Sequence, residues 1–156
     1  MKSCFFIGHR EASEGIFSAL AEAVERHIVD YGVMEFIVGN YGGFDRMAAR
    51  AVISAKALHP EISLLLLLPY HPAERPIETP PGFDGTFYPP GMESVPRRYA
   101  IVRANRYMID HVDYLIAYAW HPASNAKELT AYALRKGVAV TNLGGIRESK
   151  NSSRVS

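Results

Sequence analysis

Three residues with binding chemistry follow directly after an apolar run near the N-terminus. Residues 4–7 are typical of a β-strand, Gly8-His9-Arg10 comes next, and helical spacing begins at about residue 13. Ligands of α/β proteins bind at the carboxyl ends of the strands, and helix N-termini favour anions. We therefore predict a site for a negatively charged ligand, in which Arg10 could hold a phosphate. His9 and Arg10 could equally be surface residues of a turn.

A second loop with such chemistry is Gly39-Asn40-Tyr41-Gly42-Gly43, which precedes another predicted helix. Glycine lets the backbone approach an anion closely, so Gly42-Gly43 is the best candidate for a phosphate cradle, and Gly39 and Asn40 would lie beside it. The other interpretation is a tight strand-to-helix turn without a ligand. Asp45 could bind a ribose hydroxyl, or it could complement the helix dipole.

Glu128 is the one candidate catalytic residue, in the first turn of a helix predicted over residues 125–136. It could act as a nucleophile or a general acid/base. The spacing Asn125-x-x-Glu128 also fits a capping box, which has no catalytic role. Tyr118 and Trp120, at the end of the preceding strand, could stack on a base or simply pack in the core.

An arginine-rich helix is predicted from about residue 97 to 110. Arg98 and Asn105 are seven positions apart and share a face, so they could close the site with a cation and an amide. The remaining arginines would be solvated or paired with acidic neighbours. A lone histidine with no second ligand at suitable spacing does not indicate a metal.

These segments belong to a regular alternation of strands and helices. Strands are predicted near residues 4–7, 36–38, 62–68, 112–118 and 138–140, and helices near 13–30, 44–58, 97–110 and 125–136. The alternation predicts one Rossmann-like, three-layer α/β/α domain over residues 1–146, with a mainly parallel sheet of about five strands. We expect a disordered polar tail at residues 147–156.

The segment from Pro69 to Pro96 interrupts this alternation. It contains eight of the ten prolines and shows neither helical nor strand periodicity. Its aromatic residues argue against simple disorder, since such side chains tend to pack. We expect either a partly ordered lid over the site or a surface insertion.

Composition limits the classes of function. The chain has 156 residues, 48% of them hydrophobic, and a net charge of +1, which argues against general nucleic-acid binding. No apolar run is long enough to span a bilayer, and the N-terminus lacks a signal-peptide pattern. The single cysteine, Cys4, favours a reducing cytoplasm. A homo-oligomer is compatible with the sequence.

Several motifs in order resemble the SLOG superfamily, which joins the Smf/DprA and LOG proteins, and in particular its YpsA-like branch. The matching segments are Phe6 to Arg10, Gly39 with Gly42 to Asp45, Ala48-Ala49, Leu68-Pro69-Tyr70, and Arg97 to Asp110 continuing through Asp113 to Ile116. The resemblance implies a Rossmann-like fold and a bound nucleotide or nucleotide-derived ligand, and it adds Pro69 to the site. It implies no required cofactor. Relatives tend to have Gly-Gly at the start of the penultimate helix, whereas this chain has Ser124-Asn125, whose side chains would narrow a phosphate cradle.

The stretch from Asp113 to Val140 also resembles the nucleoside deoxyribosyltransferases, and Glu128 falls on the position of their nucleophile. Two functions follow as expectations. The first is binding of a nucleotide or nucleotide-sugar ligand, for example by a sensor, at the carboxyl edge of the sheet. The second is an enzyme that cleaves or transfers an N-glycosidic bond, either like these transferases or like the LOG phosphoribohydrolases. A third interpretation is a structural domain whose site has decayed, which the Ser124-Asn125 departure favours.

Overall fold

The alternation of strands and helices is present in the computed structural model, which describes residues 1–145. The predicted tail at 147–156 lies outside the described residues. The strands are β1 (Lys2–Gly8), β2 (Val33–Val38), β3 (Ser63–Leu67), β4 (Gly85–Phe87), β5 (Tyr114–Tyr118) and β6 (Ala139–Asn142), and the helices are α1 (Phe17–Val29), α2 (Gly43–Lys56), α3 (Ala100–His111) and α4 (Asn125–Arg135). Short 3-10 turns precede α1 and α3 at Glu14–Ile16 and Arg97–Tyr99, and another lies at Met92–Ser94.

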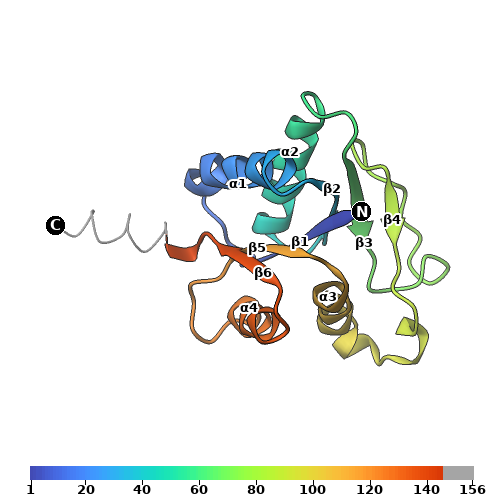
Figure 1. Cartoon of the computed structure of the whole chain (residues 1–156). Coiled ribbons are helices and arrows are strands. Elements are labelled where there is room, and N and C mark those ends of the chain that lie inside the picture. The colour runs from blue at the N-terminus through green and yellow to red at the C-terminus, as the bar shows by residue number, and fades with distance from the viewer. Residues whose placement is uncertain (146–156) are drawn as a thin grey trace.

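The strands form one parallel sheet in the order β4-β3-β2-β1-β5-β6. Helices α1 and α2 cover one face, and α3 and α4 cover the other, as Figure 1 shows. The buried side chains of β1 alternate accordingly. Cys4 and Phe6 pack with α1 and α2, whereas Phe5 and Ile7 pack with α3 and α4. The prediction of a Rossmann-like three-layer domain is confirmed.

The sheet has six strands rather than five, because the proline-rich segment contributes β4. This strand is only three residues long, which is too short to show a two-residue periodicity. It pairs with β3, so it extends the sheet at the edge that β3 would otherwise form (Figure 1).

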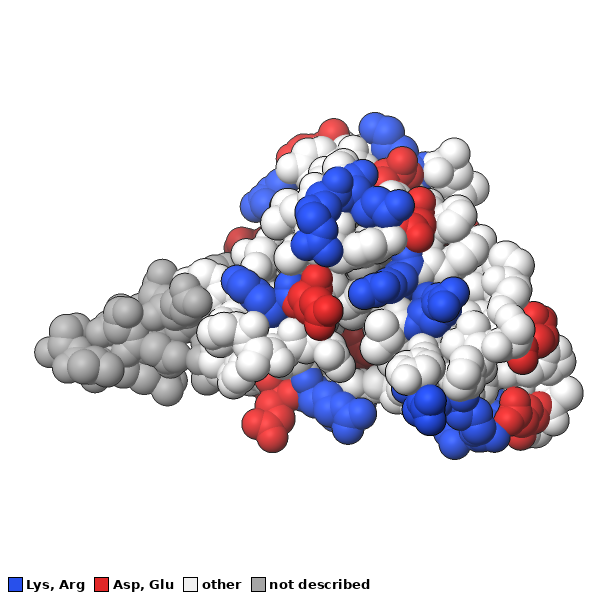
Figure 2. Space-filling model, turned by 90° about the horizontal axis from the view of Figure 1, so that it is seen from below, with Lys and Arg blue, Asp and Glu red and all other residues white. Residues whose placement is uncertain are grey.

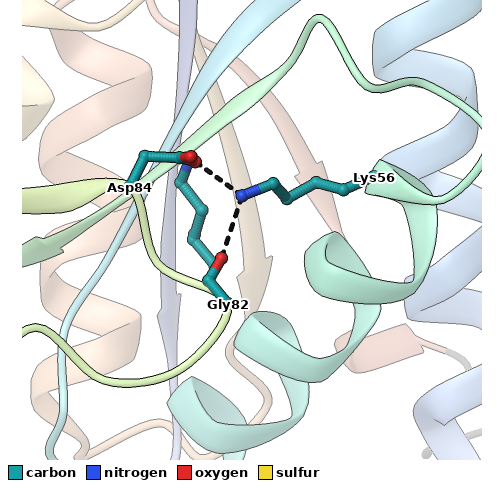
Figure 3. Close-up of polar contacts among 4 residues, drawn as sticks. Lys56, Gly82 and Asp84 are labelled. Atoms are coloured by element: carbon teal, nitrogen blue, oxygen red, sulfur yellow. Dashed lines mark hydrogen bonds and ion pairs between the residues drawn. The ribbon is translucent and has the colours of Figure 1, made fainter.

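The part of the proline-rich segment just before β4 is held by polar contacts (Figure 3). Lys56 Nζ lies 2.7 Å from Asp84 Oδ2 and donates to the Gly82 carbonyl at 2.9 Å. The Leu64 N–H donates to the same Asp84 oxygen at 2.8 Å. The aromatic residues of the segment pack as expected, Phe83 on the α1–α2 side and Phe87 on the α3–α4 side. None of the helices within residues 1–145 is long and apolar enough to cross a bilayer.

Candidate functional site

A cavity of about 300 Å³ opens at the carboxyl ends of the central strands, between the loops that follow β1 and β5. The chain leaves β1 toward β2 on one side, while β5 lies on the other side of β1. The loops after β1 and β5 therefore separate at this point, which is where doubly wound α/β domains bind ligands. The cavity wall combines the end of β1, the β2–α2 loop, the end of β3, one face of α3 and the start of α4.

Most of the predicted binding residues meet in this cavity although they come from five parts of the chain. Those that line it are Gly8, His9, Arg10, Gly39, Asp45, Pro69, Asn105, Ser124 and Asn125. Those that do not are Asn40, Gly42, Gly43 and Arg98. The parallel sheet explains the convergence, because it places the carboxyl ends of all its strands at one edge.

His9 ties the end of β1 to the end of β5. Its Nε2 accepts hydrogen bonds from the backbone N–H groups of Trp120, at 3.0 Å, and His121, at 3.3 Å. Its ring meets those of Tyr118 and Trp120 edge-on, at centroid distances of 5.5 and 5.1 Å. Tyr118 is buried and stacks on Phe44, and neither Tyr118 nor Trp120 lines the cavity. The two aromatic residues thus support the loop that carries His9.

The glycine pair at the start of α2 packs against the first loop and does not form an open cradle. The Gly43 N–H donates to the Arg10 carbonyl at 2.6 Å, and the Phe44 N–H donates to the His9 carbonyl at 3.4 Å. A Cβ on Gly42 would lie 2.6 Å from the Arg10 Cα, and one on Gly43 would lie 2.8 Å from the Arg10 carbonyl oxygen. The expected cradle is thus filled by protein backbone, and the glycines set the position of Arg10.

The start of α4, in contrast, faces the cavity. Ser124 is the N-cap residue, and its Oγ accepts from the Lys127 N–H at 3.1 Å. The cap is therefore Ser124 and not Asn125, which puts Lys127 at the third helical position and leaves Glu128 one residue beyond the place that a capping box requires. Within residues 1–145, no group accepts from the N–H groups of Asn125 and Ala126. These two donors lie at the positive end of the α4 dipole, in the cavity wall.

Glu128 is exposed and lies outside the cavity wall, to which Asn125, Ala126 and Leu129 of the same helix contribute. Its backbone N–H donates to the Ser124 carbonyl at 3.2 Å as the first regular bond of α4. A substrate in the cavity would therefore not meet the Glu128 side chain. As placed, Glu128 is an acidic group in the first turn of α4, and its catalytic role stays a prediction.

Asp45 is the carboxylate that lines the cavity. Its Oδ2 accepts from the Tyr41 N–H at 3.0 Å, and a Cβ on Gly39 would lie 3.0 Å from the same oxygen. Gly39 thus leaves room for this carboxylate. Burial raises the pKa of Asp45 to about 6, because the charged form is poorly solvated there. Across residues 1–145, no three His, Cys, Asp or Glu side chains come close enough together to hold a metal ion.

Arg10 and Asn105 are polar residues of the cavity wall whose side chains have no partner within residues 1–145. Neither the Arg10 guanidinium nor the Asn105 amide makes a hydrogen bond or an ion pair within the described part of the chain. Arg10 is exposed and Asn105 is partly buried. Arg98, the expected partner of Asn105, instead lies over the ring of Tyr99, with its Cζ 4.8 Å from the ring centroid.

The sequence did not single out the apolar part of the wall or Tyr41. Ile101 and Val102 of α3 and Leu129 of α4 line the cavity beside Asn105. Their helical spacing matches that of ordinary core residues, so periodicity could not distinguish them. Tyr41 lies in the loop Gly39 to Gly43, which was predicted to bind the ligand. Its place between the glycines of that loop is the feature of the sequence that could have identified it as a cavity residue.

Basic side chains gather on the face formed by α3 and α4, as Figure 2 shows. The residues of segments 97–111 and 125–136 that carry positive charge are Arg97, Arg98, Arg103, Arg106, Lys127, Arg135 and Lys136, against the acidic Asp110 and Glu128. We refer to this surface as the basic face. The small net charge of the whole chain thus hides an uneven distribution of charge.

The fold resembles that of a solved structure that binds DNA. Neither a protein-family model nor a curated protein matches the sequence. DNA processing protein A from Helicobacter pylori, whose structure was described for its single-stranded DNA binding mode, superposes with a TM-score of 0.61 at 14% sequence identity. The match covers 90% of this chain and 64% of the length of that protein. At this identity the likeness concerns the fold alone: the chain is a Rossmann-like α/β domain whose fold resembles that of DNA processing protein A.

This neighbour overturns one expectation. A net charge of +1 argued against general nucleic-acid binding, yet a protein of this fold binds single-stranded DNA. The inference failed because net charge sums over the whole chain, whereas a nucleic acid meets one surface. A small net charge therefore does not exclude a locally basic surface such as the basic face.

Proposed function

We propose that the cavity binds a nucleotide or a nucleotide-derived ligand. The observation that carries this proposal is the convergence of Arg10, Asn105 and the free N–H groups of α4 on one cavity at the carboxyl edge. An arginine and a helix N-terminus together favour a phosphate. The apolar side chains of α3 and α4 offer a surface for a base, and Asp45 offers an acceptor for a ribose hydroxyl.

The motifs that resemble the YpsA-like branch support the same ligand class, and we place the protein in the cytoplasm on the basis of its single cysteine. The glycosidic enzyme is not proposed, because Glu128 lies outside the cavity wall.

The test is a comparison of nucleoside and nucleotide binding by calorimetry, after a thermal-shift screen of adenine, guanine and pyrimidine nucleotides. A ligand at a hundred times its dissociation constant stabilises the fold by about 2.7 kcal/mol, which a melting curve resolves. Arg10→Gln should weaken nucleotide binding by roughly tenfold to a hundredfold, since a charged hydrogen bond contributes about 1.5–3 kcal/mol. Nucleoside binding should stay unchanged.

Arg103→Gln is the matched control, because Arg103 is exposed and does not line the cavity. An equal loss of nucleotide affinity in Arg10→Gln and Arg103→Gln would show that the phosphate is attracted by the positive charge of the protein in general and not by Arg10 in the cavity. A chain that binds no nucleotide in the screen would contradict the proposal.

A second candidate is single-stranded nucleic acid, favoured by the basic face and by the DNA-binding neighbour. Binding of a labelled oligonucleotide should then weaken with salt, with a slope of about −0.7 for each phosphate contacted. Reversing the charge of Arg103 and Arg135 to glutamate should reduce that slope. An oligonucleotide affinity that does not depend on salt would exclude the basic face as the binding surface.

A further inference from the structure

The proline-rich segment forms the wall of a second cavity beside the first. This cavity, of about 310 Å³, is lined by residues of the β2–α2 loop and by residues 68–70 and 75–77. Tyr41 and Pro69 line both cavities, so the two spaces are neighbours along the carboxyl edge of the sheet. Each is of the size that holds a small ligand unit.

The residues of the second cavity carry the chemistry that binds a nucleotide. Tyr41 supplies an aromatic ring, Arg75 supplies a guanidinium that lies over the ring of Tyr70, and Asn40 supplies an amide. Aromatic rings stack on bases of any sequence, and arginine binds phosphate oxygens. Asn40, a predicted binding residue that the first cavity does not include, lies here.

Tyr70 is held in place before any ligand arrives. The Cζ atoms of Arg75 and Arg97 lie 4.5 and 5.3 Å from the centroid of its ring. Arg97 also forms an ion pair with Glu74, which links the segment to the turn before α3. No carboxylate within residues 1–145 pairs with Arg75, so its charge is not neutralised by an ion pair there.

We propose that the two cavities form one site for two linked nucleotides, the second of which is held by Tyr41, Tyr70 and Arg75. This inference rests on the proposed function of the first cavity. The shared chemistry is two nucleosides joined by a phosphodiester, whether as a free dinucleotide or as part of a single strand.

The experiment compares thymidine 5′-monophosphate, the dinucleotide pTpT and the corresponding tetranucleotide by calorimetry with the full chain. The dinucleotide should bind at least tenfold more tightly than the mononucleotide. Arg75→Gln and Asn40→Ala, two changes at exposed positions, should remove this gain and leave mononucleotide binding intact. Arg26→Gln, at an exposed arginine of α1 that lies outside both cavities and outside the basic face, should keep the gain.

Each outcome separates this inference from the proposed function. A dinucleotide that binds no more tightly than the mononucleotide overturns the second site and leaves the first. Equal loss in Arg75→Gln and Arg26→Gln also overturns it, because general charge would then explain the gain. The remaining outcome is a gain in dinucleotide affinity that only the Arg75 change removes. In that case, tighter binding of the tetranucleotide would identify the ligand as a longer strand. Equal affinity of the tetranucleotide and the dinucleotide would identify the ligand as a free dinucleotide.

Discussion

Two helices begin at the same edge of the sheet, yet only one presents free N–H groups to the cavity. At the start of α2, the amides of Gly43 and Phe44 donate to carbonyls of the first loop. At the start of α4, those of Asn125 and Ala126 lie in the cavity wall. Glycine pairs before helices are commonly taken as anion sites. Here the glycines serve close packing, and the helix with larger residues at its start is the open one.

The largest effect on stability is expected at the start of α2, which packs closely against the first loop. Gly42 has a φ of +140°, and a Cβ there would lie 2.6 Å from the Arg10 Cα. Gly42→Ala should therefore lower the free energy of unfolding by about 2–5 kcal/mol, through backbone strain and overpacking together. Chemical denaturation measures this loss.

Gly91→Ala is the control for that change. Gly91 also has a positive φ, of +81°, but a Cβ there would meet no atom within 4 Å. It should show the strain alone, about 1–3 kcal/mol. If Gly42→Ala costs no more than Gly91→Ala, the close packing of α2 against the first loop is not important for stability.

Asp45→Asn tests the carboxylate in the first turn of α2 and should stabilise the fold at pH 8. The pKa of Asp45 rises from its ordinary value of 3.8 to about 6 in the folded state. The folded protein therefore holds a proton that the unfolded chain releases, and stability falls as the pH rises through that window. Above pH 6 the whole penalty is present, roughly 2–3 kcal/mol, since one pKa unit corresponds to 1.36 kcal/mol.

Denaturation curves at pH 3.5, 5 and 8 check this sign. The advantage of Asp45→Asn should be small at pH 3.5, where the carboxyl is protonated in both states, and should grow with pH. A constant difference across the series would mean that desolvation of Asp45 is not its cause.

Ser124→Ala tests the open end of α4. The Ser124 hydroxyl accepts from the Lys127 N–H, so its removal should cost about 1 kcal/mol. Ser124→Gly should cost only a few tenths, because glycine is itself tolerated at this cap position. Thermal melts of both variants measure the difference, and equal costs would show that the cap bond is not what holds this end.

Glu128→Gln should have the smallest effect. An exposed side chain outside the cavity should change stability by less than about 0.5 kcal/mol and leave nucleotide affinity unchanged. The corresponding readout is calorimetry with the best ligand of the screen. A tenfold loss of affinity would place the Glu128 carboxylate at the ligand, contrary to its position in the fold.

The candidate site could be predicted in part, because a parallel sheet brings the loops after its strands to one edge. Arg10, Asp45, Asn105 and Ser124, predicted from motif order and from their places after strands or on helices, line one cavity. Arg98 was misplaced, since sharing a helical face with Asn105 does not decide which side chain reaches a cavity. Whether Gly42 and Gly43 bound a ligand or packed on Arg10 depended on a segment more than thirty residues away.

The sequence by itself determined the α/β class and most element boundaries, because apolar periodicity and helix-ending residues act locally. It also indicated which edge of the sheet carries polar chemistry. Only the tertiary structure decided that the proline-rich segment adds β4, that α4 rather than α2 opens onto the cavity, and that the basic side chains of α3 and α4 share one face. Each of these depends on which distant segments come into contact, and local patterns along the chain do not record such contacts.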